Sequence, residues 1–96
     1  MGNASQIHVE LLSNDNPMTF SVVVVEGGGK SQHRVTVDRA LFQQLSAGRA
    51  TPEGLIQAAF LFLLDREPKE SILSRFDITV IAKYFPEFPK KIGNYL

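Results

Sequence analysis

The sequence contains no cysteine, and its charges cancel. Without thiols the chain can form neither disulfides, nor a cysteine zinc site, nor a cysteine nucleophile. Ten Lys and Arg residues balance ten Asp and Glu residues. A duplex-binding domain usually carries a basic excess, because much of its affinity comes from neutralising phosphates. The net charge of zero therefore argues against a function in nucleic-acid binding, although a chain with no net charge can still carry a local basic patch.

Long apolar runs are also missing. The longest one extends from Leu55 to Leu64 and is interrupted by Gln57, whereas a membrane-spanning helix needs about 20 apolar residues. The first residues lack the basic and apolar regions of a signal peptide. We therefore expect a cytoplasmic protein that does not bind a membrane, and the absence of cysteine is compatible with a reducing compartment.

The length and composition suit one small globular domain. The chain has 96 residues, of which 44% are hydrophobic, and this is enough for one core but too little for two. We expect a single domain over residues 1–96, with loose termini at about 1–5 and 90–96.

The first half predicts an antiparallel meander of three strands. Apolar and polar residues alternate at about 6–12 and 32–37, and a run of four valines lies within about 19–26. The sequence GGGKS at 27–31 is similar to a phosphate-binding loop. The full pattern needs another glycine at the position of Val24 and a helix after the lysine, so we interpret it as a hairpin loop.

The second half predicts three to four helices, at about 38–47, 52–66, 69–75 and 78–85. Thr51-Pro52-Glu53 is a typical helix start, since threonine suits the cap and proline the first turn. The last segment is rich in β-branched residues, so a strand stays open there. The predicted fold class is α+β, with the helices packed on one face of the meander.

The helix at about 52–66 is the least ordinary element. Apolar side chains surround almost its whole circumference, whereas a surface helix usually carries a narrower apolar stripe. It therefore lies either at the centre of its own domain or in an interface shared with another subunit.

No constellation of residues predicts catalysis. His8 and His33 are the only histidines, and no acidic cluster stands near them in the sequence. No serine lies in a nucleophile-elbow motif, and no carboxylate pair has a recognisable glycosidase arrangement. We predict no catalytic residue, no cofactor and no metal site.

Two segments are candidates for an interaction surface. Residues 65–71 alternate charges of both signs, which is typical of a solvated junction but also allows a recognition corner of Arg66, Lys69 and Arg75. Residues 84–88 carry three aromatics, which either pack internally or anchor a partner. With the apolar helix, the candidate surface comprises Phe60, Leu61, Arg66, Glu67, Lys69, Glu70, Arg75, Tyr84 and Phe88.

A series of short motifs runs through the second half: TPE at 51–53, AFLFLL at 59–64, REPKESIL at 66–73, RFD at 75–77, Ile81, and YFPE at 84–87. In this series the chain resembles a family of small uncharacterised bacterial proteins. The first half matches that family only in general pattern. The family has no assigned activity, so the resemblance implies a bacterial cytoplasmic setting but no catalytic or binding residue.

Three functions stay open. The one we favour is a non-enzymatic protein-interaction or regulatory domain, which binds a protein partner or self-associates through the apolar helix or a strand edge. The second is a nucleic-acid-associated regulator, for which the following residues would have to converge: Arg34, Arg39, Arg49, Arg66, Lys69 and Arg75. The third is an enzyme with an unrecognised site drawn from Glu67, Glu70, Arg75 and Asp77.

Overall fold

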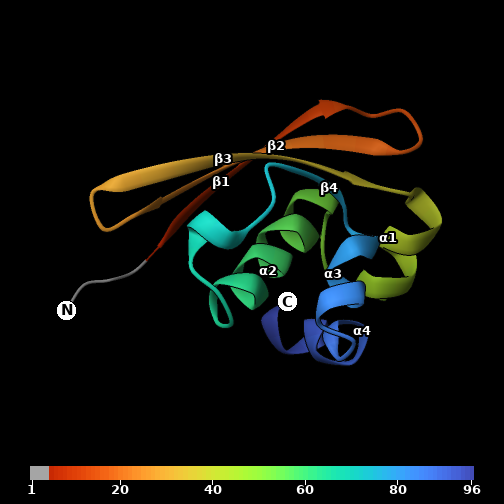
Figure 1. Cartoon of the computed structure of the whole chain (residues 1–96). Coiled ribbons are helices and arrows are strands. Elements are labelled where there is room, and N and C mark those ends of the chain that lie inside the picture. The colour runs from red at the N-terminus through yellow and green to blue at the C-terminus, as the bar shows by residue number, and fades with distance from the viewer. Residues whose placement is uncertain (1–4) are drawn as a thin grey trace.

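The computed structural model describes residues 5–96, which form a mixed sheet with helices on one face (Figure 1). The strands are β1 (Gln6–Ser13), β2 (Met18–Glu26), β3 (Gly29–Val37) and β4 (Arg75–Asp77), in the order β1-β2-β3-β4. The first three form the predicted antiparallel meander, and each is one to three residues longer than predicted. The α+β prediction is confirmed, with the addition of β4, which pairs parallel to β3.

The helices are α1 (Arg39–Ser46), α2 (Pro52–Leu64), α3 (Thr79–Tyr84) and α4 (Phe88–Lys91), with short 3₁₀ turns η1 (Lys69–Ser71) and η2 (Ile92–Tyr95). The structure resolves the choice left open for 78–85, which is helical in α3. Among residues 5–96 none of these helices has the length and apolar character needed to cross a membrane.

The prediction of a helix over 69–75 is correct for its first turn and wrong for the residues after it. Only η1 is helical, and the chain is already extended at Ile72. The extended segment that follows forms hydrogen bonds with β3, from Arg34 N to Ser74 O (2.8 Å) and from Ile78 N to Thr36 O (2.9 Å). Pairing with a strand some 40 residues away therefore outweighs the local helical preference.

The GGGKS segment is a hairpin loop, as predicted. Gly27 and Gly28 adopt φ of 61° and 82°, and Glu26 pairs with Gly29 across them. Two central residues at positive φ make the tight reversal that matches strand twist, and glycine adopts this conformation without steric cost. Lys30 already lies in β3, so no helix follows the loop.

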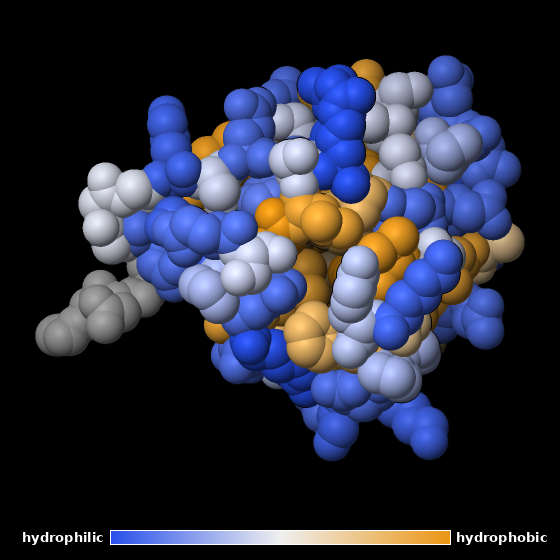
Figure 2. Space-filling view, viewed as in Figure 1, coloured by the Kyte–Doolittle hydropathy of each residue, from blue (hydrophilic) through white to orange (hydrophobic). Residues whose placement is uncertain are grey.

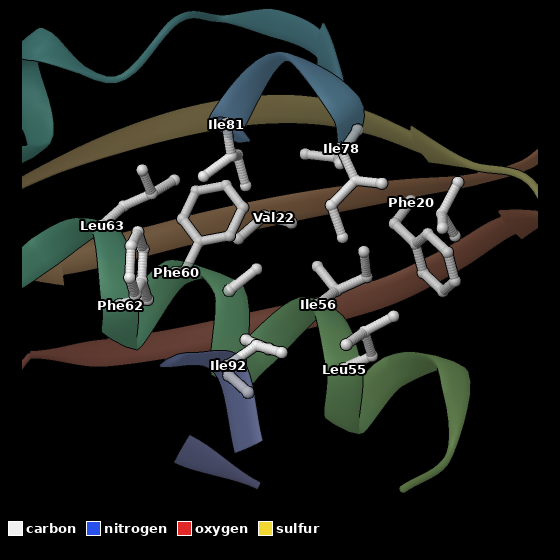
Figure 3. Packing of buried hydrophobic residues seen from close by; sticks show 14 of the residues in the cluster. Phe20, Val22, Leu55, Ile56, Phe60, Phe62, Leu63, Ile78, Ile81 and Ile92 are labelled. Atoms are coloured by element: carbon white, nitrogen blue, oxygen red, sulfur yellow. The ribbon is translucent and has the colours of Figure 1, made fainter. Parts of the chain in front are cut away.

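Helix α2 lies at the centre of the core, which settles the choice that the sequence left open. Seven of its thirteen residues are buried: Leu55, Ile56, Ala58, Ala59, Phe60, Phe62 and Leu63. The sheet covers it with the inward residues of β2, such as Phe20 and Val22. Figure 3 shows Ile78 and Ile81 from the α3 region and Ile92 from η2 directed toward the same helix.

The prediction of a loose C-terminal tail is wrong. Residues 88–95 form α4 and η2, and Ile92 is only 2% exposed. Phe88 and Tyr95 pack edge-on against Phe62, at ring-centroid distances of 5.0 and 5.8 Å. The tail is ordered because it covers apolar surface of α2 that the sheet cannot reach.

The prediction for the N-terminus falls mostly on residues 1–4, which lie outside the described part of the chain. Ser5 is described, and its hydroxyl donates a hydrogen bond to Glu26 (2.8 Å).

The docked tail makes a stability prediction. We expect Ile92→Ala to lower the free energy of unfolding by about 2–5 kcal/mol, because it empties a buried site. Leu61 of α2 is 38% exposed, so Leu61→Ala should lower the free energy of unfolding by well under half of the loss expected for Ile92→Ala. Urea unfolding followed by circular dichroism measures both variants. Equal, small losses would mean that the tail does not pack against α2.

Candidate functional site

An apolar groove lies between the end of α2, the η1–β4 segment and α3. Its volume is about 380 Å³, and it appears as an orange recess near the centre of Figure 2. Its polar lining residues are Glu67 and Ser71. The other lining residues are large and apolar: Leu63, Ile72, Leu73, Phe76, Val80, Ile81, Tyr84 and Phe85.

Two of these side chains are unusually exposed. Leu73 is 47% exposed and Tyr84 is 68% exposed, more than any other large apolar or aromatic side chain in residues 5–96. Large apolar groups that stay exposed around one depression are typical of binding sites, and tyrosine is enriched among the residues that dominate interfaces.

His33 positions the wall that carries Leu73. Its ring is buried on the inward face of β3 and packs 5.2 Å from the ring of Phe60. Nδ1 donates to the backbone carbonyl of Leu73 (2.7 Å), since a carbonyl can only accept. Nε2 forms a second hydrogen bond, with the hydroxyl of Ser31 (2.8 Å). Both ring nitrogens are used, so His33 is a structural bridge between β3 and the groove.

The two histidines lie on opposite faces of the sheet. His8 is exposed on β1, where it pairs with Val23, while His33 points into the core. Within residues 5–96 no group of three or more His, Asp or Glu side chains could hold a metal ion.

Asp77 positions the wall formed by α3. Its carboxylate accepts hydrogen bonds from the hydroxyl of Thr36 (2.6 Å) and from the backbone N–H (3.1 Å) and hydroxyl (2.8 Å) of Thr79. Burial would raise the pKa of Asp77, but these hydrogen bonds outweigh it and hold the pKa below its ordinary value. Asp77 thus joins the start of α3 to β3, and both its oxygens are occupied.

Glu67 is the only charged side chain that lines the groove. It forms neither an ion pair nor a side-chain hydrogen bond with the rest of the described chain, and burial raises its pKa above the ordinary value. Glu70 differs, because the ammonium of Lys69 lowers its pKa. The pKa of Glu87 is also lowered, by its own backbone N–H and by Arg66. Glu67 is therefore a partly desolvated carboxylate without a partner.

Arg66 faces away from the groove, toward the C-terminal segment. Its guanidinium donates to Glu87 (3.1 Å) and to the hydroxyl of Tyr95 (3.3 Å), and its Cζ lies 3.7 Å from the centre of the Phe62 ring. The Tyr95 hydroxyl in turn donates to Asp65 (2.6 Å). These contacts hold η2 against α2, so this part of the charged junction is structural.

The predicted recognition corner does not form, because its three cations have separate surroundings. Arg66 contacts the tail, as described above. Lys69 is only 8% exposed, lies close to Gly29 of the hairpin and donates to Glu70 (2.7 Å). Arg75 points outward from β4, beside Arg34 of β3.

The candidate interaction surface is only partly exposed. Phe60 and Phe88 are buried, at 0% and 2% exposure, because Phe60 of α2 packs against His33 of β3 and Phe88 packs against Phe62 of α2. Leu61 is exposed but does not line the groove. Glu67 and Tyr84 do line it, and the prediction missed Leu73, which alternation of side chains in an extended segment would have turned outward.

The residues considered for the other two functions are dispersed. Arg39 donates to Asn14 (2.6 Å) and Arg49 to the carbonyl of Gly93 (3.2 Å), so these cations serve loop contacts. Of the four residues considered for an enzyme, Glu67 lines the groove, Glu70 pairs with Lys69, and Asp77 is held by threonines. No nucleophile–base pair is formed among them.

No family model matches the chain, and no curated protein or solved structure matches it.

The unpartnered carboxylate makes a prediction with a defined pH dependence. Below its ordinary pKa of 4.5 Glu67 is protonated whether the chain is folded or not. Burial disfavours the ionised carboxylate in the folded chain but not in the unfolded chain. The free energy of unfolding therefore falls as the pH rises from the ordinary pKa through the raised pKa. Glu67→Gln should therefore raise the urea midpoint at pH 7, and the gain should vanish below about pH 4.5.

The matched control is Glu70→Gln, whose effect should have the opposite sign. The pKa of Glu70 is lowered by Lys69, so its charge stabilises the folded chain at neutral pH. That contribution is lost as the pH falls through the lowered pKa. If Glu67→Gln is neutral or destabilising at pH 7, then Glu67 does not carry an unrelieved burial cost.

Proposed function

We propose that the protein is a non-enzymatic interaction domain that binds a segment of a partner protein in the groove between α2, η1 and α3. One observation carries the proposal. The two most exposed large apolar side chains among the described residues, Leu73 and Tyr84, line the same depression. Leaving them in water is unfavourable, and a partner that covers both removes that cost.

The groove suits side chains of a short segment. A volume of about 380 Å³ is near the lower end of the range of about 300–1,000 Å³ for ligand sites. Ile81 and Leu63 lie at its buried side, while Leu73 and Tyr84 are open to solvent. We infer that one or two large apolar side chains of the partner enter between Leu73 and Tyr84.

Glu67 defines the charge of the partner. A carboxylate that has lost part of its hydration without gaining a donor binds a cation favourably, because the pairing replaces the lost water. A lysine or arginine next to the apolar side chains of the partner supplies that donor. The proposed partner is therefore a peptide segment that combines large apolar residues with one basic residue.

The setting of this interaction is part of the proposal. The resemblance of the second half to small bacterial proteins supports a bacterial cytoplasm. A second copy of the chain is the alternative occupant, because β1 is an edge strand of eight residues and Leu12 on its outer face is 45% exposed. The groove is the better supported surface, since it brings the two most exposed large apolar side chains and the carboxylate of Glu67 to one depression.

The test is a selection from a displayed random peptide library, followed by titration of the selected synthetic peptide. We expect selected peptides to pair large apolar residues with Lys or Arg. Leu73→Glu and Tyr84→Ala should each weaken binding about tenfold or more, which corresponds to about 1.4 kcal/mol, a typical loss at a dominant interface residue. Glu67→Gln should weaken binding of the basic peptides in particular.

The matched control is Leu61→Glu, which places the same charge on an exposed leucine outside the groove. Urea midpoints show whether each variant is folded. Selected peptides that bind all variants equally would contradict the proposal. A monomer–dimer equilibrium in sedimentation that Leu73→Glu abolishes would instead assign the groove to a second copy.

A further inference from the structure

The outer face of the sheet carries two arginines in direct register. Arg34 of β3 and Arg75 of β4 are paired positions of the parallel ladder, and both side chains are exposed. Their inward neighbours Val35 and Phe76 face the core, so the arginines project from the opposite side. With Ser21 and Glu10 they form one row across the four strands.

These two are the arginines whose side chains the fold does not use. The chain has five arginines, and the guanidinium groups of Arg39, Arg49 and Arg66 are held by acceptors of other segments. Within the described residues neither Arg34 nor Arg75 donates a side-chain hydrogen bond or forms an ion pair.

Two carboxylates of the neighbouring strand positions form no ion pair with the arginines. Asp77 lies two residues beyond Arg75, but its oxygens accept from Thr36 and Thr79. Glu10 stands at the far end of the row, beyond Ser21, and forms no ion pair with any residue of the described range.

The backbone holds the two cations together against their repulsion. Like charges directly opposite each other destabilise a sheet. The register is nevertheless set by the hydrogen bonds that flank the pair, from Arg34 N to Ser74 O and from Ile78 N to Thr36 O. The two arginines therefore stay at paired positions of the ladder whether or not a counter-ion is present, so both guanidinium groups can reach one anion on this face.

A polar hollow of about 250 Å³ lies beside the pair. Arg34 and Arg75 line it together with Ser21, Gln32, His33 and Ser74. The hydroxyls and the amide offer neutral donors, and the guanidinium forks match the spacing of oxyanion oxygens.

We propose that this hollow binds a phosphate group in its dianionic form. Two neighbouring arginines without an ion-pair partner favour a ligand that brings two negative charges and several acceptor oxygens, and such a ligand can be bound by both forks at once. A phosphomonoester on a protein side chain and free inorganic phosphate share this chemistry. A nucleic-acid backbone offers one charge per phosphate and needs a wider basic surface, which a neutral chain with dispersed cations does not supply.

The test is a titration of the isotope-labelled full chain with inorganic phosphate and with a phosphoserine peptide. Binding is monitored through the amide chemical shifts at constant ionic strength. We expect saturable shifts centred on residues 32–34 and 74–76. Arg34→Gln and Arg75→Gln should each weaken binding at least fivefold. Arg34→Lys should also weaken it, because lysine keeps the charge but loses the fork.

Lys30→Gln is the matched control, since Lys30 is an exposed cation on the same outward face of β3, and it should leave binding unchanged. Saturating phosphate should raise the urea midpoint of the wild type and of Leu73→Glu, but not of Arg75→Gln. Leu73→Glu changes the groove but not the arginine pair, so its response to phosphate tests this site independently of the groove. The phosphate proposal and the proposed function can therefore be contradicted separately.

Tighter binding of the phosphoserine peptide than of the unphosphorylated peptide would identify a modified protein as the source. Equal saturation by free phosphate and by the phosphopeptide would identify the free anion. Shifts spread over all surface lysines, or binding of single-stranded DNA with steep salt dependence and no saturation by phosphate, would overturn the proposal.

Discussion

The structure depends on the need to cover α2 on nearly every side. Seven buried residues leave this helix with only a narrow polar side around Gln57. A meander of three strands covers one side of a helix and cannot reach the other. The segments after α2 therefore return over it: α3 contributes Ile81, α4 Phe88 and η2 Ile92, all of which are buried. The ordered tail follows from this constraint, as do the contacts of Arg66 with Glu87 and Tyr95 that hold it in place.

The same constraint explains where the groove lies. The groove lies at the C-terminal end of α2, where Leu63 of the helix and Glu67, three residues beyond it, are among its lining residues. The short helix α3 and the η1–β4 segment form the walls of the groove and join at Asp77, whose carboxylate accepts hydrogen bonds from Thr79. Each wall is fixed by a polar contact to β3, through His33 on one side and Asp77 on the other. The groove is therefore a preformed feature held by the sheet.

The sequence predicted most elements of the fold, because strand alternation and helix starts are local signals. Valines of β2 and the Thr51-Pro52 start of α2 are such signals, and Thr51 does cap its helix through Gly54 N (3.0 Å). The groove was not predicted, because β4 exists only through pairing with β3, and no local pattern reports that pairing. Phe88 was assigned to a surface for the same reason: its partner is Phe62, 26 residues earlier. Of the candidate site, Glu67 and Tyr84 were identified, while their common groove required the tertiary structure.

The extended segment around β4 connects the two surfaces. Leu73 and Phe76 line the groove, while Ser74 and Arg75 line the polar hollow on the other side of the sheet. Within β4 itself Arg75 and Phe76 point to opposite faces, as neighbouring positions of an extended chain do. The segment is held to β3 by the backbone bond from Arg34 to Ser74 and by the His33 bond to the carbonyl of Leu73. Both surfaces therefore rest on the same few hydrogen bonds, and a change that releases β4 from β3 must disturb the groove and the arginine pair together.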